Sequence, residues 1–168
     1  TDSEYTASND CSVLLEGVEK EGYRTITIAG MRGTEATSQI DEIVSGVTQT
    51  VHGTVEISQD QYDLTVRQYG RDAVPLTESE PTATSSELGL IIDVVGDTQE
   101  IANTICSMAR SEMLHHSFEG RLAVSGNLAI PYSPADIEIG AVYGFSIHHL
   151  LEDVAQDTIY SIQTEEIK

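Results

Sequence analysis

The sequence predicts an α+β fold, a two-layer sandwich arranged as a ferredoxin-like split βαβ unit with an additional strand. Three observations lead to this prediction. Two stretches alternate apolar and polar residues as half-buried strands do, one stretch is apolar on both faces, and two stretches carry apolar residues at helical spacing. In chain order they are strand, helix, strand, strand, helix and strand, and a further strand follows.

The first half of the chain supplies two strands and a helix. Residues 23–30 alternate in the period-two pattern of a strand, and we expect residues 13–18 to pair with them as a hairpin. From residue 38, isoleucines and valines recur on one helical face until Gly53, which predicts a helix. Residues 62–70 alternate again, which predicts a second strand with one solvated face.

The second half begins with residues 87–96, which are apolar on both faces. This pattern predicts a central strand that is covered on both sides, either by helices alone or by helices and a partner. Asp97 has the character of an N-cap, with Glu100 three residues later, so we expect a helix from there to about His115. Short strands are expected at 121–124 and 141–149.

The length of 168 residues fits a single domain, which we place at residues 11–168. Residues 1–10 are polar, and we expect them to be frayed. Residues 75–87 contain little apolar surface and many Pro, Ser, Thr and Glu residues, so they are not assigned structure.

The chain is strongly acidic, with 28 Asp and Glu residues against 8 Lys and Arg residues, for a formal net charge of −20. Such a polyanion repels nucleic acids and anionic membrane surfaces, so neither is expected as a partner. The composition is typical of a cytoplasmic protein from a salt-accumulating halophile, in which salt screens the repulsion among carboxylates.

The sequence indicates no metal site and names no cofactor. Cys11 and Cys106 are far apart, and the P-loop, the dinucleotide fingerprint and the nucleophile elbow are all missing. Four of the five histidines form adjacent pairs at 115–116 and 148–149, and adjacent side chains diverge too far to chelate one ion. We therefore expect structural histidines, with His115 favoured at a helix C-terminus.

Asp93 is a candidate catalytic acid or base because it interrupts the most apolar strand. A buried carboxylate without a partner is destabilising and has a raised pKa. Arg24, Arg67 and Arg110 are the candidate partners. The alternative is a solvated Asp93 at the edge of the sheet.

Residues 125–140, SGNLAIPYSPADIEIG, carry no charge before Asp136 and should form a rigid connection at one end of the sheet. Ser125, Gly126 and Asn127 suit an anion-holding turn, and we expect Asn127 and Ser133 to face a shared crevice. His148 or His149 could reach this crevice as a proton-transferring group. The alternative is that Asn127 bonds the backbone of its own turn. The predicted substrate-binding residues are Gly126, Asn127, Tyr132, Ser133 and Arg110.

Three blocks of the sequence, residues 22–32, 87–116 and 120–152, resemble the C-terminal region of the acyclic terpene utilisation (AtuA) family, and GNLAIPYSPADI is their most specific part. The resemblance implies a role in the breakdown of branched acyclic terpenoids through acyl-CoA intermediates, together with a companion N-terminal-type domain. It supplies no established catalytic residue.

Two functions remain open at this point. The chain could be a module or subunit of an AtuA-like metabolic protein that acts on a hydroxy-acid or acyl-CoA substrate with its companion. Alternatively, it could be a non-catalytic module that gives such an assembly its structure. Either function predicts a homo- or hetero-oligomer.

Overall fold

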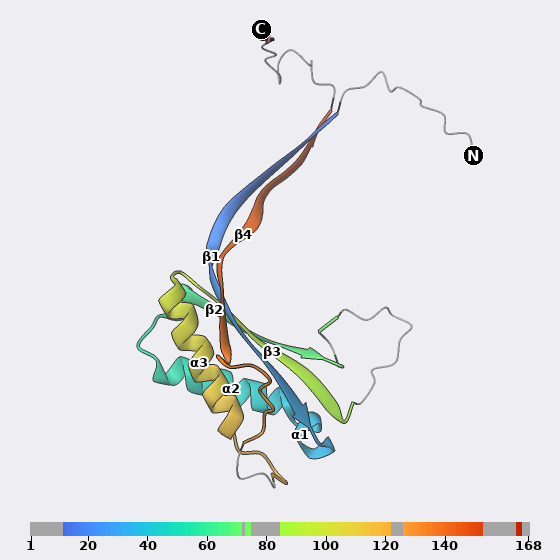
Figure 1. Ribbon diagram of the computed structural model, residues 1–168, viewed down its shortest axis with the longest axis vertical. Helices are drawn as coiled ribbons and strands as arrows, with labels where there is room; N and C mark the ends of the chain where they lie inside the picture. Colours follow the sequence, from blue (N-terminus) through green and yellow to red (C-terminus); the bar gives the residue numbers. More distant parts are fainter. Residues whose placement is uncertain (1–11, 72, 75–84, 122–125, 153–163, 166–168) are drawn as a thin grey trace, which may run out of the picture. The chain divides into compact units, whose positions relative to one another are not determined.

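The computed structural model describes residues 12–71, 73–74, 85–121, 126–152 and 164–165 (Figure 1). The described residues between 20 and 142 form one compact unit, and residues 12–19 and 143–152 belong to a second. The predicted frayed segment, residues 1–10, lies outside the described residues.

The larger unit confirms the α+β prediction, because it contains a four-stranded antiparallel sheet packed against helices. The strands lie in the order β2-β3-β1-β4. In chain order the elements are β1 (Val13–Arg32), α1 (Thr34–Ser38), α2 (Ile40–Thr54), the 3-10 turn η1 (Gln59–Gln61), β2 (Tyr62–Tyr69), β3 (Glu87–Gly96), α3 (Gln99–His115) and β4 (Asp136–Leu151).

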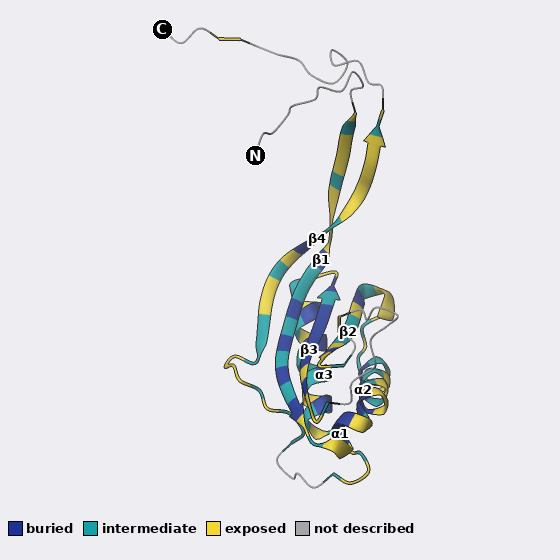
Figure 2. Cartoon of the chain, turned by 90° about the vertical axis from the view of Figure 1, so that its right-hand side faces the viewer, coloured by how far each residue is buried: buried dark blue, intermediate teal, exposed yellow. Residues whose placement is uncertain are grey.

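The helices cover one face of the sheet, and the core lies between the two layers. Along β1 and β3, buried residues alternate with more exposed ones, as the banding in Figure 2 shows. The buried positions pack against α2 and α3 in one cluster, whose fully buried members include Met31, Leu88, Leu90, Ile92, Val94, Ile40, Ile43, Val47, Val51, Ile105 and Met113.

Both long helices follow the predicted apolar pattern. In α2 the buried residues are Ile40, Ile43, Val47 and Val51, which recur at helical spacing. The N-cap of α3 is one residue later than expected, because the hydroxyl of Thr98 accepts the backbone N–H of Ile101.

The predicted hairpin between residues 13–18 and 23–30 is wrong, because both stretches belong to the single strand β1. Gly22 lets the strand pass closely over the end of β3. A Cβ at Gly22 would lie 2.6 Å from the backbone oxygen of Gly96, so a side chain there would force the two strands apart.

The last strand also differs from the prediction. It begins at Asp136, so the segment expected to be an irregular connection already contains the first residues of β4. Before it, Ala129 exchanges two backbone hydrogen bonds with Gly30 of β1, each 2.8 Å long. The short strand expected at 121–124 falls almost wholly outside the described residues, and Arg121 is not in a strand.

The second unit contains the N-terminal part of β1 and the C-terminal part of β4. Several of its described large apolar side chains are exposed to solvent. Leu14 is 49% exposed, Ile147 is 52% exposed and Phe145 is 72% exposed. Ile147 packs over Gly17, where an added Cβ would lie 3.2 Å from the Cβ of Ile147.

Candidate functional site

The sheet face opposite the helices, here called the open face, is a mixed apolar and charged surface. Side chains alternate between the two faces along each strand, so the pairing register shows which residues lie on the open face. Thr25 and Thr27 are buried against the helices, and the residues next to them in β1 face away. No described element covers it. On β1, β3 and β2 its members are Arg24, Ile26, Ile28, Arg32, Glu87, Ile91, Asp93, Val95, Asp63, Thr65, Arg67 and Tyr69.

On β4 the same alternation places Ile137 and Ile139 on the open face. Asp136 and Glu138 hydrogen-bond to side chains of α3, so the residues between them point the other way. Ile139 is 51% exposed. The isoleucines at positions 26, 28, 91 and 137 are half-buried.

Asp93 lies at the centre of the open face and is paired, as the sequence requires. Its Oδ1 lies 2.9 Å from Nε of Arg24, and its Oδ2 lies 3.2 Å from Nη2 of Arg67. The Arg67 contact is a hydrogen bond, whereas the Arg24 contact is an ion pair without hydrogen-bond geometry. The Asp93 side chain is 10% exposed, against 35% and 47% for the two arginines. Both carboxylate oxygens of Asp93 are thus engaged by arginines from the two neighbouring strands, which favours a structural role over proton transfer.

Arg110, the third candidate partner of Asp93, pairs with Asp136 instead. Its Nε and Nη2 donate to the two carboxylate oxygens of Asp136 at 2.7 and 3.0 Å. Thr27 of β1 donates to the same carboxylate at 2.5 Å. This cluster joins α3, β1 and β4, so the guanidinium predicted to bind substrate is occupied within the fold.

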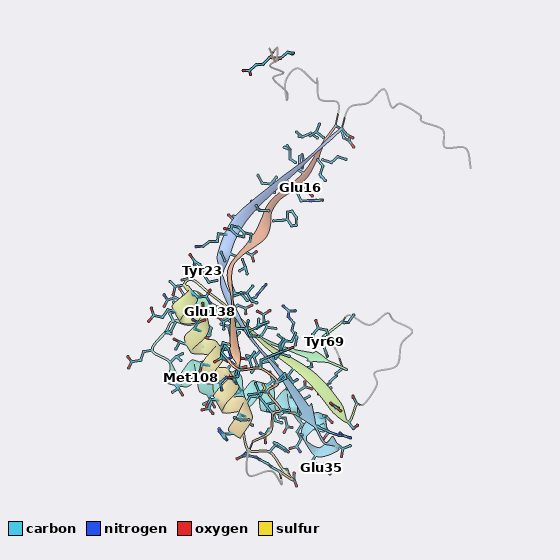
Figure 3. The ribbon with its side chains drawn as sticks, viewed as in Figure 1. Glu16, Tyr23, Glu35, Tyr69, Met108 and Glu138 are labelled. Atoms are coloured by element: carbon cyan, nitrogen blue, oxygen red, sulfur yellow. The ribbon has the colours of Figure 1, made fainter. Side chains whose placement is uncertain are left out.

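The cluster continues along α3 through polar side chains. Asn103 donates to Glu138 at 2.6 Å and accepts from Thr25 at 2.5 Å. Gln99 donates to Thr25 at 2.7 Å. Figure 3 shows Glu138 projecting from β4 beside α3. An open groove of about 470 Å³ lies over this cluster, lined in part by Asn103, Arg110 and Asp136.

These contacts change the ionisation of two groups. Burial alone would raise the pKa of Asp136, but hydrogen bonds from Arg110 and Thr27 outweigh it and hold that pKa below its usual value. Burial raises the pKa of the Cys106 thiol to about 11. Cys106 therefore stays a neutral thiol at neutral pH, which disfavours a nucleophilic role.

Asn127 caps helix α3. Its Nδ2 donates to the backbone oxygens of Met113 and His116 at 3.2 and 2.8 Å, and its own N–H donates to the oxygen of Leu114. These carbonyls belong to the helix end and not to the turn of Asn127, so the capping role differs from both alternatives weighed from the sequence.

Gly126 and Asn127 also line a cavity of about 260 Å³. Its other lining residues include Arg32, Glu35 and Phe118. Ser133 and Tyr132, the remaining predicted substrate-binding residues, are exposed and do not line this cavity. A crevice shared by Asn127 and Ser133 stays a prediction.

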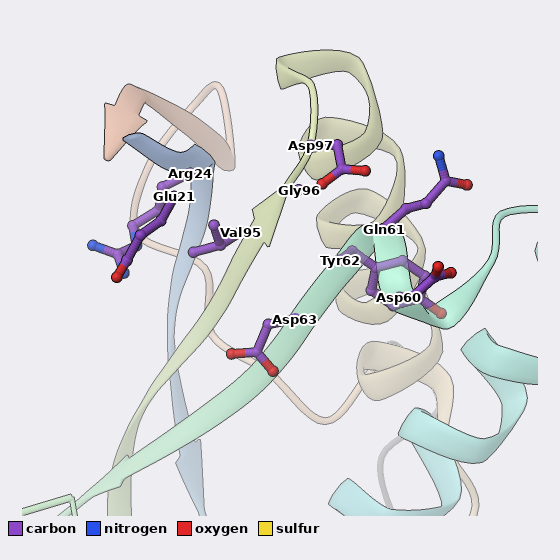
Figure 4. A pocket seen from close by; sticks show the side chains of 9 residues that line it. All are labelled: Glu21, Arg24, Asp60, Gln61, Tyr62, Asp63, Val95, Gly96 and Asp97. Atoms are coloured by element: carbon purple, nitrogen blue, oxygen red, sulfur yellow. The ribbon is translucent and has the colours of Figure 1, made fainter. Parts of the chain in front are cut away.

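A third cavity of about 370 Å³ lies at the end of the sheet where β2 begins (Figure 4). It is lined by Arg24 and by four carboxylates, those of Glu21, Asp60, Asp63 and Asp97. In Figure 4 these side chains point in different directions and do not converge on one position. Among the described residues, no group of His, Cys, Asp and Glu side chains is placed to hold a metal ion.

The histidine pairs have separate surroundings. His116 packs against α2, where a Cβ added at Gly46 would lie 2.6 Å from its ring. His148 lies 3.5 Å from Glu16 within the second unit, and His149 is exposed. A proton-transferring role for His148 or His149 stays a prediction.

The residues that sequence reasoning missed are Asp136 and its partner Thr27. The only signal was that Asp136 is the first charge after a long uncharged stretch.

Comparisons with protein-family models, curated proteins and solved structures find no match to this chain. The resemblance to the acyclic terpene utilisation family thus stays a prediction. No described helix combines the length and the apolar character needed to cross a bilayer.

Proposed function

We propose that this chain is a non-catalytic assembly module that docks onto a protein surface through its open face. The observation that carries the proposal is the lack of any covering layer over a half-apolar sheet face, within the described residues. In a two-layer fold, a sheet face that is not covered within the chain and bears several isoleucines is a typical interaction surface.

The charge of the open face supports the same function. Within the paired strands it carries three arginines, Arg24, Arg32 and Arg67, and three acids, Asp63, Glu87 and Asp93. The paired strands of this face are therefore neutral, whereas the whole chain has 8 basic and 28 acidic residues. Further acids, Glu21, Asp60 and Asp97, lie only at the end of the face where β2 begins. A neutral, apolar face can lose water on docking without leaving unpaired carboxylates behind.

We further infer that the sandwich is a ferredoxin-like split βαβ fold. The elements follow in the order strand, helix, strand, strand, helix, strand. The central strands β3 and β1 are flanked by β2 and β4. The extension of β1 and β4 into the second unit is the addition to this plan.

A metabolic function with a companion domain, as the resemblance implies, is the second candidate. The observation that favours it is the 260 Å³ cavity, because Arg32 and Glu35 could bind opposite charges of a small substrate there. Against it, the described residues bring no nucleophile or titratable base into that cavity apart from Glu35.

The experiment compares the native assembly of the wild-type chain with that of Ile139→Glu, both isolated from the producing cells in molar KCl. We expect the wild type in a particle larger than the monomer and the variant largely released from it. Native mass spectrometry reads both masses. A wild-type chain that is isolated as a lone monomer would contradict an assembly function.

A further inference from the structure

We propose that a second copy of this chain covers the open face, with the two sheets packed face to face about a twofold axis. This inference rests on the proposed assembly function and identifies the partner. Face-to-face sheets pack about 10 Å apart, a distance that interdigitated isoleucine side chains fill. In a twofold interface both copies use the same patch of surface. The patch therefore has to be complementary to itself.

The area of the open face is sufficient for such a dimer. Strand β2 has 8 residues and the sheet has four strands. At about 3.3 Å per residue and about 4.8 Å between strands, this gives a face of roughly 500 Å². Two copies would bury about 1,000 Å² or more together, which reaches the size that specific interfaces need.

The distribution of charge makes the open face complementary to itself. Asp93 lies between Arg24 and Arg67, so the centre of the face carries two guanidiniums and one carboxylate. Asp63 lies beside this group on β2, directly across from Val95. Each copy thus brings partly exposed guanidiniums and, in Asp63, an exposed carboxylate, which can pair across the twofold axis.

The charge of the rest of the chain favours a second copy over a basic partner. A basic protein would be attracted to acidic surface anywhere on a chain of net charge −20, with no preference for its neutral face. A neutral face selects another neutral, apolar face, and a second copy supplies one. It also keeps the remaining carboxylates in solvent.

The test is sedimentation equilibrium of the purified chain in molar KCl, with two matched variants. Ile139→Glu places a carboxylate on the open face, at a side chain that is 51% exposed. Leu14→Glu makes the same change in charge at a 49% exposed strand position of the second unit. We expect a wild-type dimer, a dissociation constant raised at least about tenfold by Ile139→Glu, and little change with Leu14→Glu.

Added KCl should tighten the dimer, because screening weakens the repulsion between two acidic copies. Circular dichroism and thermal melting establish that both variants stay folded. A monomeric wild type, or equal weakening by both variants, would overturn the homodimer. The assembly function fails separately, if Ile139→Glu leaves the particle isolated from cells unchanged in mass.

Discussion

Asp136 at the start of β4 accepts two hydrogen bonds from the guanidinium of Arg110 on α3, at 2.7 and 3.0 Å. The pair is mostly buried, with 22% of the Asp136 side chain and 23% of the Arg110 side chain exposed. It ties the edge strand to the helical layer. A bidentate, largely buried ion pair of this kind stabilises the fold more than a surface ion pair does, because solvent screens it less.

Replacement of Asp136 by Ala should lower the free energy of unfolding by about 2–3 kcal/mol, because it leaves a largely buried guanidinium without its partner. The matched control is Asp41→Ala. Asp41 also pairs with an arginine, Arg71, but its side chain is 63% exposed, so we expect a loss of less than about 1 kcal/mol. Urea unfolding in molar KCl measures both. Equal losses would contradict the importance assigned to burial.

The stability of the fold should fall in acid partly through Asp136. Its folded-state pKa lies below the ordinary value of 3.8, so its contribution is present above that value and is lost as the pH falls through the lower folded-state pKa. Asp136→Asn should therefore flatten the dependence of unfolding free energy on pH in this acidic range. Denaturant titrations of wild type and variant across the range measure the slope. Parallel curves would argue against a lowered pKa.

Asn127→Ala should destabilise the chain by about 1–2 kcal/mol, because two backbone oxygens at the end of α3 lose their donor. Ser133→Ala, in the same connection but at an exposed position, should change the stability by less than about 0.5 kcal/mol. Thermal or urea unfolding distinguishes them. If Asn127→Ala unfolds like the wild type, the cap contributes little and a ligand-binding role for Asn127 regains weight.

Cys106 should resist thiol reagents in the native protein, because its side chain is fully buried and its pKa is raised to about 11. A Cys11→Ser background leaves Cys106 as the single thiol. We expect its modification at neutral pH to follow the rate of unfolding and to be immediate in denaturant. Rapid reaction under native conditions would show that α3 separates readily from the sheet.

Added KCl should raise the melting temperature steeply, because it screens repulsion within a chain of net charge −20. Melts at low and at molar KCl, with an uncharged osmolyte as the control for solvent exclusion, measure the effect. An unchanged midpoint in KCl would contradict the halophilic interpretation.

Much of the fold follows from local sequence patterns. The spacing of apolar residues predicts α2, and alternation predicts β2, because each element buries one face and solvates the other. The apolar character of β3 predicts its central position. An isolated acid in such a strand needs a partner, and two of the three candidate arginines, Arg24 and Arg67, do pair with Asp93.

Other features depend on contacts between distant segments, which local patterns do not contain. Residues 13–18 and 23–30 look like the two strands of a hairpin, yet they belong to one strand, in which Gly22 is required by the close approach of Gly96 from β3. Asn127 looks like a turn residue, yet it caps a helix that ends more than ten residues earlier. In both cases the tertiary partner decides the role.

The sequence by itself determined the α+β class, the helical faces, the central strand and the need to pair Asp93, because each follows from the burial of side chains along one segment. Only the tertiary structure decided that Arg110 pairs with Asp136 and that one sheet face stays uncovered within the described residues. The physical reason is that partner choice and coverage depend on which segments meet in space. Several candidate partners satisfy the same local pattern until the chain is folded.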